Sequence, residues 1–237
     1  MRRRSAFFPA AAALMTLVVF AGFLPSFYLR PWFRSAALPG YLMVHAIVMT
    51  LWQLLFLAQT VLVAAGRTDL HRALGRVGAA LAVAVVVVGI HTTLNQPALY
   101  AARGIRLPFP LEELVIGNIV GFGLFAGLIA AAIVKRRDAA THGRLIYWAC
   151  VVTMGPALTP SRALGAAIAP YFPASFPPEI ALGWIAWIAL LANDWLNVRR
   201  FHPATIVGGM LILFVGPALL DGLLTIEPLL AWARALA

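Results

Sequence analysis

The stretch YLMVHAIVMTLWQLLFLAQTVLVAA (residues 41–65) contains no Asp, Glu, Lys or Arg. A helix needs about 20 predominantly apolar residues to cross the hydrocarbon core of a bilayer. Residues 41–65 meet that length without a charged side chain to anchor them in water. The stretch therefore predicts a transmembrane helix.

The rest of the chain has the same character. Of its 237 residues, 62% are hydrophobic and 11% are charged, whereas soluble proteins contain roughly 45–50% apolar residues. The single cysteine, Cys150, lies in an apolar run, which excludes a disulfide framework and thiolate-held zinc or iron–sulfur sites. The arginines lie in short gaps between apolar runs, a pattern typical of membrane topology and not of nucleic-acid binding. The composition therefore predicts an integral membrane protein.

Seven apolar runs approach or exceed the length of a transmembrane helix. They cover residues 6–28, 41–65, 77–96, 111–134, 145–164, 180–198 and 204–224. The first follows Met1 and three arginines but is too long for a signal peptide, so a retained anchor is expected. Prolines are expected to end the third run before Pro97 and to kink the fifth at Pro156 and Pro160. The expected fold is an all-α, polytopic helical bundle of about seven spans, with residues 1–237 as one membrane domain.

The distribution of basic residues predicts the orientation of these spans. If the N-terminus is inside, 12 Lys and Arg residues lie on the inner side and 6 on the outer side. The inner set is Arg2, Arg3, Arg4, Arg67, Arg72, Arg76, Lys135, Arg136, Arg137, Arg144, Arg199 and Arg200; the outer set is Arg30, Arg34, Arg103, Arg106, Arg162 and Arg234. This bias favours an N-inside, C-outside protein of the bacterial inner membrane, with anionic lipid headgroups at its inner turns.

One polar stripe runs along the second predicted span. His45, Trp52 and Gln59 recur at seven-residue spacing, which falls only about 20° short of two helical turns, so the three side chains share one face. One interpretation is a seam that hydrogen-bonds to neighbouring helices. The other is that His45 is a ligand or proton carrier, because polar groups at membrane depth are costly and commonly functional. His91, on the antiparallel third span, is expected at a similar depth and within reach of His45.

Paired imidazoles across an apolar bundle suit the axial positions of a haem iron. His45 with His91 would be one pair, and His71 with His142 a second, where Arg72, Arg76 and Arg144 are candidates to bind the haem propionates. Electrons could then cross the bilayer between two haem b groups, and a redox protein or a quinone would be the partner. Twenty residues separate His71 from His91, which places them on opposite faces if the helix between them is continuous.

A competing hypothesis takes His71, His142 and His202 as the three ligands of a zinc site. Asp69, Asp138 and Asp194 would support it, and three imidazoles plus a water form a hydrolytic centre. Seven-span zinc hydrolases of the ceramidase and progestin-receptor-like type use three histidines in this way, but the last span here lacks their paired histidines. The simplest alternative is that these histidines cap helix starts and the arginines contact lipid headgroups.

Other membrane chemistries lack the residues they need. A retinal photoreceptor requires a lysine in its last span, and the only lysine here is Lys135, in a predicted turn. The chain also has no Gly-rich phosphate loop and no Ser nucleophile motif.

Several spaced motifs extend over most of the chain. They are His45-x6-Trp52-x6-Gln59, Gly66-Arg67-x-x-Leu70-His71-Arg72-x-x-Gly75, His142-x-Arg144-Leu145, Pro156-Ala157 and Arg200-x-His202-Pro203. On these motifs the chain resembles small bacterial seven-span membrane proteins without an assigned biochemical role. The resemblance implies a shared seven-span scaffold and brings no substrate or cofactor with it. The histidine placement is also similar in layout to that of di-haem membrane cytochromes.

The expected function is haem b binding for electron transfer or cytochrome assembly. A non-enzymatic membrane scaffold or a small-solute permease is the alternative, and a zinc hydrolase is the third possibility.

Overall fold

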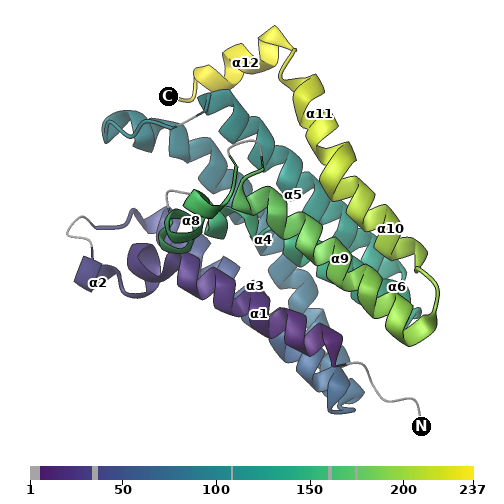
Figure 1. The fold of residues 1–237 in the computed structure, drawn as a ribbon. Helices are drawn as coiled ribbons and strands as arrows, with labels where there is room; N and C mark the ends of the chain where they lie inside the picture. Colours follow the sequence, from purple (N-terminus) through teal and green to yellow (C-terminus); the bar gives the residue numbers. More distant parts are fainter. Residues whose placement is uncertain (1–5, 34–36, 108, 160–161, 174–175) are drawn as a thin grey trace.

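A computed structural model of the chain describes residues 6–33, 37–107, 109–159, 162–173 and 176–237. All regular elements within these residues are helices (Figure 1). Six of the helices are long and apolar enough to cross a membrane, namely Phe7–Tyr28, Gly40–Ala64, Thr68–Ala102, Leu111–Val134, Pro178–Val198 and Pro203–Leu223. The prediction of an all-helical protein is confirmed for these residues, and the six long apolar helices are compatible with a protein embedded in a membrane.

The order of elements along the chain is simple. The helices are α1 (Phe7–Phe23), α2 (Arg30–Phe33), α3 (Gly40–Ala64), α4 (Thr68–Ala102), α5 (Leu111–Val134), α6 (Ala139–Val152), α7 (Gly155–Leu158), α8 (Ala163–Ile168), α9 (Pro178–Val198), α10 (Pro203–Met210), α11 (Gly216–Leu223) and α12 (Glu227–Arg234). A π-helical turn at Leu24–Tyr28 extends α1, another at Leu211–Val215 joins α10 to α11, and a 3₁₀ turn at Ala169–Tyr171 follows α8.

Proline and glycine set several of the helix boundaries. Pro178 and Pro203 are the first residues of α9 and α10, where proline has no hydrogen bond to lose and its fixed φ suits the helix. Gly66 follows the end of α3 with a φ of 82°. That left-handed conformation is accessible to glycine without steric penalty, so the chain reverses tightly into α4.

Helix α4 is longer than the sequence predicts. It contains 35 residues, about 52 Å at 1.5 Å per residue, and extends beyond residues 77–96 at both ends. The expectation that Pro97 ends the helix is wrong: Pro97 is buried inside α4, and helical structure continues to Ala102. Neighbouring helices and local adjustments allow a proline in a membrane helix.

The fifth predicted span departs most from expectation. In place of a kinked helix over residues 145–164, α6 has 14 residues and ends at Val152. It is about 21 Å long, shorter than the hydrocarbon core of about 30 Å. A turn at Thr153 and Met154 leads into α7, whose first turn contains Pro156. Pro160 lies outside the described residues, and a seventh span remains a prediction.

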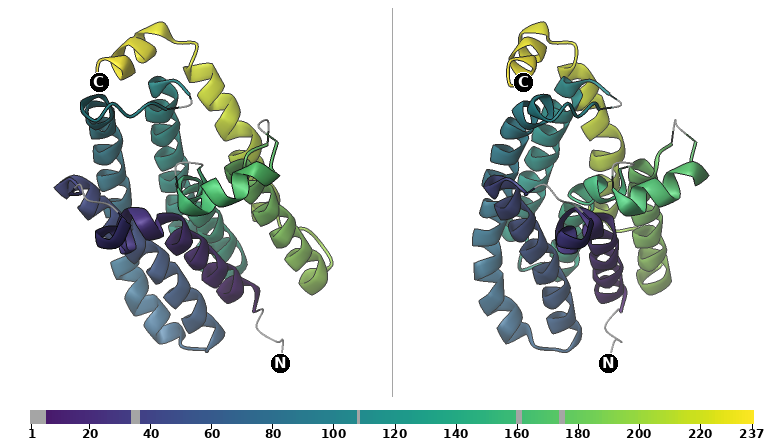
Figure 2. Two further views of the ribbon diagram at one scale, coloured as in Figure 1. Left: turned by 60° about the vertical axis from the view of Figure 1, so that its left-hand side comes forward. Right: turned by 90° about the vertical axis from the view of Figure 1, so that its left-hand side faces the viewer.

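Three connections lie at one end of the bundle, which we call the turn end. They are the α3–α4, α5–α6 and α9–α10 connections, and the start of α1 lies near them (Figures 1 and 2). The opposite end, which we call the loop end, holds α12 and the α4–α5 connection (Figure 2). The turns that precede or contain His71, His142 and His202 therefore lie at the same end of the bundle.

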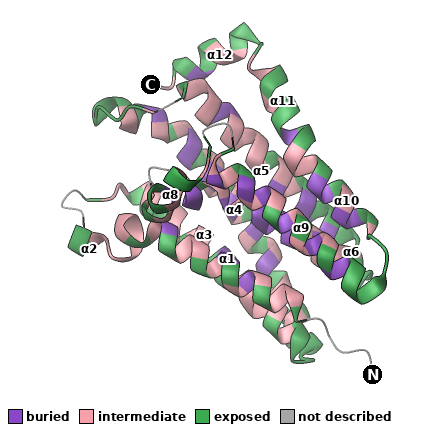
Figure 3. Ribbon diagram, viewed as in Figure 1, coloured by how far each residue is buried: buried purple, intermediate pink, exposed green. Residues whose placement is uncertain are grey.

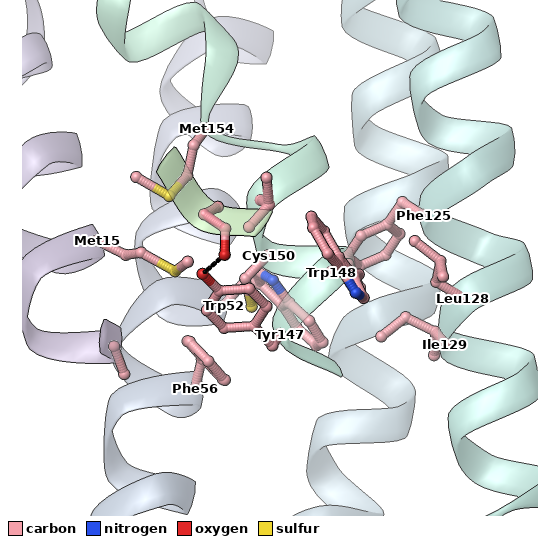
Figure 4. Packing of buried hydrophobic residues seen from close by; sticks show 14 of the residues in the cluster. Met15, Trp52, Phe56, Phe125, Leu128, Ile129, Tyr147, Trp148, Cys150 and Met154 are labelled. Atoms are coloured by element: carbon pink, nitrogen blue, oxygen red, sulfur yellow. Dashed lines mark hydrogen bonds between the residues drawn. The ribbon is translucent and has the colours of Figure 1, made fainter. Parts of the chain in front are cut away.

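The core of the protein is built around α6. Trp148, Ala149 and Cys150 are fully buried, and purple buried segments concentrate around this helix (Figure 3). Tyr147 donates a hydrogen bond to the Ala186 carbonyl, 2.9 Å away, while Trp52 packs edge-on against Phe125 in the same cluster (Figure 4). The second half of α6, residues 147–151, is buried in protein, so a short helix that ends at Val152 is acceptable here. Non-helical backbone at membrane depth is tolerated where protein shields it from lipid.

Candidate functional site

Two imidazoles meet at the turn end, as predicted for the second histidine pair. The rings of His71 on α4 and His142 on α6 lie edge to face, with centroids 6.2 Å apart. His142 Nδ1 is 2.9 Å from the Ala132 carbonyl. A carbonyl can only accept, so Nδ1 carries a proton, and in the neutral ring Nε2 is the nitrogen with the lone pair. Gln59 Nε2 donates to the His71 carbonyl at 3.2 Å.

Two buried polar atoms beside the His71–His142 pair have no hydrogen-bond partner. They are Nδ1 of His71 and Oε1 of Gln59. Leaving such an atom buried and unpaired costs about 1–3 kcal/mol. Helices α4 and α6 both pack on α5, and the imidazoles reach toward each other beside it. The ring nitrogens of His71 and His142 and the Gln59 Oε1 atom make few hydrogen bonds to the protein, so they could contact a metal or a polar ligand.

Next to the imidazole pair is a buried ion pair between α6 and α9. The Arg144 guanidinium contacts Asp194 Oδ1 through Nη2 and Nε, the latter at 3.1 Å. The two side chains are 7% and 0% exposed. A buried charge is tolerated only when paired and hydrogen-bonded, and this pair satisfies both conditions.

Further hydrogen bonds saturate the ion pair and extend it to α10. Asp194 Oδ2 accepts from the Thr205 hydroxyl at 2.6 Å and from the His202 backbone N–H at 2.9 Å. Arg144 Nη1 donates to the Ala140 carbonyl at 2.8 Å. The network therefore joins α6, α9 and α10 at the turn end.

This network changes the role predicted for Arg144. The Arg144 guanidinium was predicted to bind a haem propionate, but it is paired with the Asp194 carboxylate. The signal available in the sequence was two opposite charges, Arg144 and Asp194, in or beside apolar runs, each too costly to bury alone. Thr205, which completes the network, carries no comparable signal.

The three-histidine zinc site does not form. His202 caps α10 instead, with Nδ1 accepting from the Ala204 N–H at 3.1 Å. Among the described residues, no group of three or more His, Cys, Asp or Glu side chains is close enough to hold a metal ion. The capping alternative is thus confirmed for His202, whereas His71 and His142 lie inside the first turns of their helices.

Two titratable groups at the turn end have shifted pKa values. Burial lowers the pKa of His202, and the Arg144 cation lowers it further. Asp138 caps α6 by accepting from the N–H groups of Ala140 and Thr141. The hydrogen bond from the Thr141 hydroxyl lowers the pKa of the Asp138 carboxyl, so this cap stays ionised and effective. Asp69 is exposed and pairs with Arg67 at 3.7 Å.

The first histidine pair is not assembled as predicted. His91 is exposed, and its ring lies edge-on to Tyr41 with centroids 5.9 Å apart. His45 is half-buried, and its Nδ1 has no hydrogen-bond partner. The structure gives no ring contact between the two histidines. His71 and His91 share one uninterrupted helix, so the geometric objection to two haems facing a single core stands.

The other basic residues predicted at the inner turns are exposed in the described part of the chain. They are Arg67, Arg72, Arg76, Lys135, Arg136, Arg137, Arg199 and Arg200. Exposed guanidinium groups at this level fit contact with anionic lipid headgroups. Arg2, Arg3, Arg4 and Arg34, which also entered the charge count, lie outside the described residues.

Comparison with known proteins adds no relative: no family model, curated protein or solved structure matches this chain.

Proposed function

We propose that this chain is a seven-span protein of the bacterial inner membrane that binds one haem b between His71 and His142, for electron transfer or cytochrome assembly. The observation that carries the proposal is the pairing of these imidazoles, 6.2 Å between ring centroids, from two helices that both pack on α5. Neutral imidazole is a common axial ligand of haem iron.

The surroundings of His142 support a role as a ligand. In metal-binding histidines the second ring nitrogen usually donates to a carbonyl or carboxylate, which fixes the ring and its tautomer. His142 has this arrangement through Nδ1 and the Ala132 carbonyl. Nε2 is then the nitrogen available to the iron.

The surroundings of His71 support the proposal in two further ways. Its unpartnered Nδ1 is a buried acceptor or donor that a bound group would satisfy. Arg72 and Arg76 follow it on α4 and are exposed, so they are the candidates to bind the propionates, in place of Arg144.

An optical spectrum of the intact chain tests the proposal. The protein is purified in mild detergent from cells supplied with haem precursor, and iron is measured in the same sample. We expect a reduced α-band of bis-histidine type and about one haem per chain. His71→Ala and His142→Ala should each lower the haem content at least tenfold, whereas His91→Ala, on the same helix but away from the pair, should leave it unchanged. A colourless, iron-free wild-type protein would overturn the proposal.

The interruption after α6 favours a second candidate, a small-solute permease. Broken helices near the middle of the membrane line the substrate sites of many transporters, and α6 ends at Val152 before the short α7. Uptake of glycerol or urea into proteoliposomes tests it. A rate above that of protein-free vesicles, reduced by Pro156→Leu, supports a permease; equal rates count against one for these solutes.

The proposed orientation places the turn end in the cytoplasm. It is supported by the exposed basic residues at that end. Single cysteines replace Arg136 at the turn end and Arg106 at the loop end, in a Cys150→Ser background. A membrane-impermeant thiol reagent added outside spheroplasts should label Arg106→Cys and spare Arg136→Cys; the reverse pattern would overturn the orientation.

A further inference from the structure

A groove opens between α3 and α4 toward the loop end. It measures about 270 Å³ and is lined by Tyr41, Val44, Val87, Val88 and His91. The rings of Tyr41 and His91 lie edge to face, 5.9 Å between centroids, and the three valines form the rest of the wall. The groove is therefore apolar over most of its surface, with an aromatic hydroxyl and an imidazole as its polar groups.

His91 is the unusual member of this lining. It lies within a helix long and apolar enough to cross the membrane, yet it is exposed, and its ring has no hydrogen bond among the described residues. A polar side chain facing lipid is costly. A ligand oxygen that accepts from the imidazole N–H would remove that cost.

A second imidazole flanks the same groove. His45 follows Val44 on α3, and its Nδ1 is buried without a hydrogen-bond partner. The groove is therefore lined by one histidine, His91, and the neighbour of its lining residue Val44 is a second histidine with an unpartnered ring nitrogen.

The polar and apolar parts of the groove occupy different depths. Tyr41 is the second residue of α3, so it lies near the membrane interface, and Val44 lies one turn deeper. The lining contains no Lys, Arg, Asp or Glu. A charged phosphate headgroup would have no counterion here, whereas a neutral ring with polar oxygens finds both a donor and apolar walls.

We infer that this groove binds the ring of a lipid-soluble quinone. The His91 imidazole donates to one quinone carbonyl, Tyr41 packs against the ring edge, and the valines contact the ring faces and the start of the isoprenoid tail. The Tyr41 hydroxyl donates to the Asn95 carbonyl at 3.3 Å, which leaves its lone pairs for a quinol hydroxyl. The groove and the His71–His142 pair lie about 30 Å apart along α4, so quinone binding does not depend on haem.

Saturable quinone binding by the intact chain tests the inference. The full-length protein is placed in lipid nanodiscs, and binding of a decyl-substituted benzoquinone is measured above the partition into protein-free nanodiscs. We expect about one quinone per chain. His91→Phe, which keeps a ring and removes the donor, should weaken binding at least fivefold, and Val87→Phe, which fills the groove, at least tenfold.

A matched variant separates the groove from the general lipid-facing surface. Val83 lies one turn from Val87 and is 63% exposed, against 62% for Val87, but it does not line the groove. Val83→Phe should bind quinone as the wild type does. All variants are required to match the wild type in elution volume and thermal unfolding in detergent.

Three outcomes would overturn the inference. Decylbenzene, which has the same tail but no carbonyl oxygens, could compete as strongly as the quinone, which would make the groove a site for hydrocarbon only. An anionic phospholipid could displace the quinone stoichiometrically, which would make it a headgroup site. Binding could also fail to saturate. None of these results depends on the haem spectrum, so each proposal can fail separately.

Discussion

The two ends of the bundle treat charged side chains in opposite ways. At the turn end, Arg144 and Asp194 are withdrawn from solvent, and both Asp194 oxygens accept hydrogen bonds. At the loop end, Arg234 on α12 pairs with Glu112 at 3.2 Å and with Glu227, while 47% of the arginine side chain is exposed. Both ends therefore use an arginine and a carboxylate to join helices.

Burial, and not the number of ion pairs, decides how much such a contact contributes to stability. A charge buried away from water is strongly destabilising when its partner is removed. An exposed pair exchanges its partner for water at little cost, and salt screens it. We therefore expect the turn end to hold the bundle together and the loop end to tolerate change.

The largest effect is expected from Asp194→Ala. Removal of the carboxylate leaves the buried Arg144 guanidinium without a counter-charge and should lower the free energy of unfolding by about 3–5 kcal/mol. Unfolding in mixed detergent, followed by circular dichroism, measures it. Asp221→Ala, at an exposed carboxylate on α11, is the control. If both variants unfold alike, the ion pair does not stabilise the turn end.

A smaller effect is expected where helices approach closely. A methyl group at Gly208 on α10 would overlap the Trp148 ring, and overpacking of this kind costs about 1–3 kcal/mol. Gly222, in the same apolar run but toward the loop end, has open space around it. Thermal unfolding should therefore shift downward for Gly208→Ala and stay the same or rise for Gly222→Ala. Equal shifts would mean that α10 adjusts freely around Trp148.

Arg234→Ala at the loop end should lower the free energy of unfolding by less than about 1 kcal/mol, because exposed pairs contribute little. High salt should reduce the difference from the wild type further. Unfolding curves at low and high ionic strength measure both quantities, with Arg200→Ala as a control at an exposed arginine. A loss as large as that of Asp194→Ala would contradict the contrast between the two ends.

The smallest effect concerns pH. The pKa of His202 is lowered from 6.5, chiefly by burial, so the unfolded state binds a proton at this residue more readily than the folded state. The contribution of neutral His202 to the free energy of unfolding is fully present above about pH 6.5. It decreases on acidification toward the lower pKa that His202 has in the folded state. His202→Asn keeps a side-chain cap for α10 and should show a shallower decline of stability on acidification.

The matched control for this titration is His91→Asn, which removes an exposed imidazole on α4, far from α10. It should retain the wild-type decline. A His202→Asn profile that coincides with the wild type would show that capping of α10 is not linked to protonation.

Much of the helical pattern was predictable from apolar run length. The second, fourth, sixth and seventh runs agree with α3, α5, α9 and the α10–α11 rod to within two residues at each end. Run length fails for two of the helices. α4 continues through Pro97 with a polar first turn at Thr68 and Asp69, and α6 stops early inside a protein-lined core.

The candidate site was partly predictable. The pairing of His71 with His142 followed from two hairpins that open at one end, because antiparallel helices bring such positions together. The assignment of Arg144 could not follow, since a guanidinium binds a propionate or a carboxylate equally well. Only the packing of α6 against α9 and α10 selects Asp194.

The all-helical class and the position of the basic residues in the gaps between apolar runs could be predicted from the amino-acid sequence, because hydrophobicity and charge act locally along the chain. Which polar groups face each other depends on how the helices pack. This packing buries Arg144 with Asp194, places His71 beside His142 and sets the His91 ring against Tyr41. These outcomes depend on helix rotation and on the point at which a helix ends, and neither quantity is encoded in the apolar length of a single span.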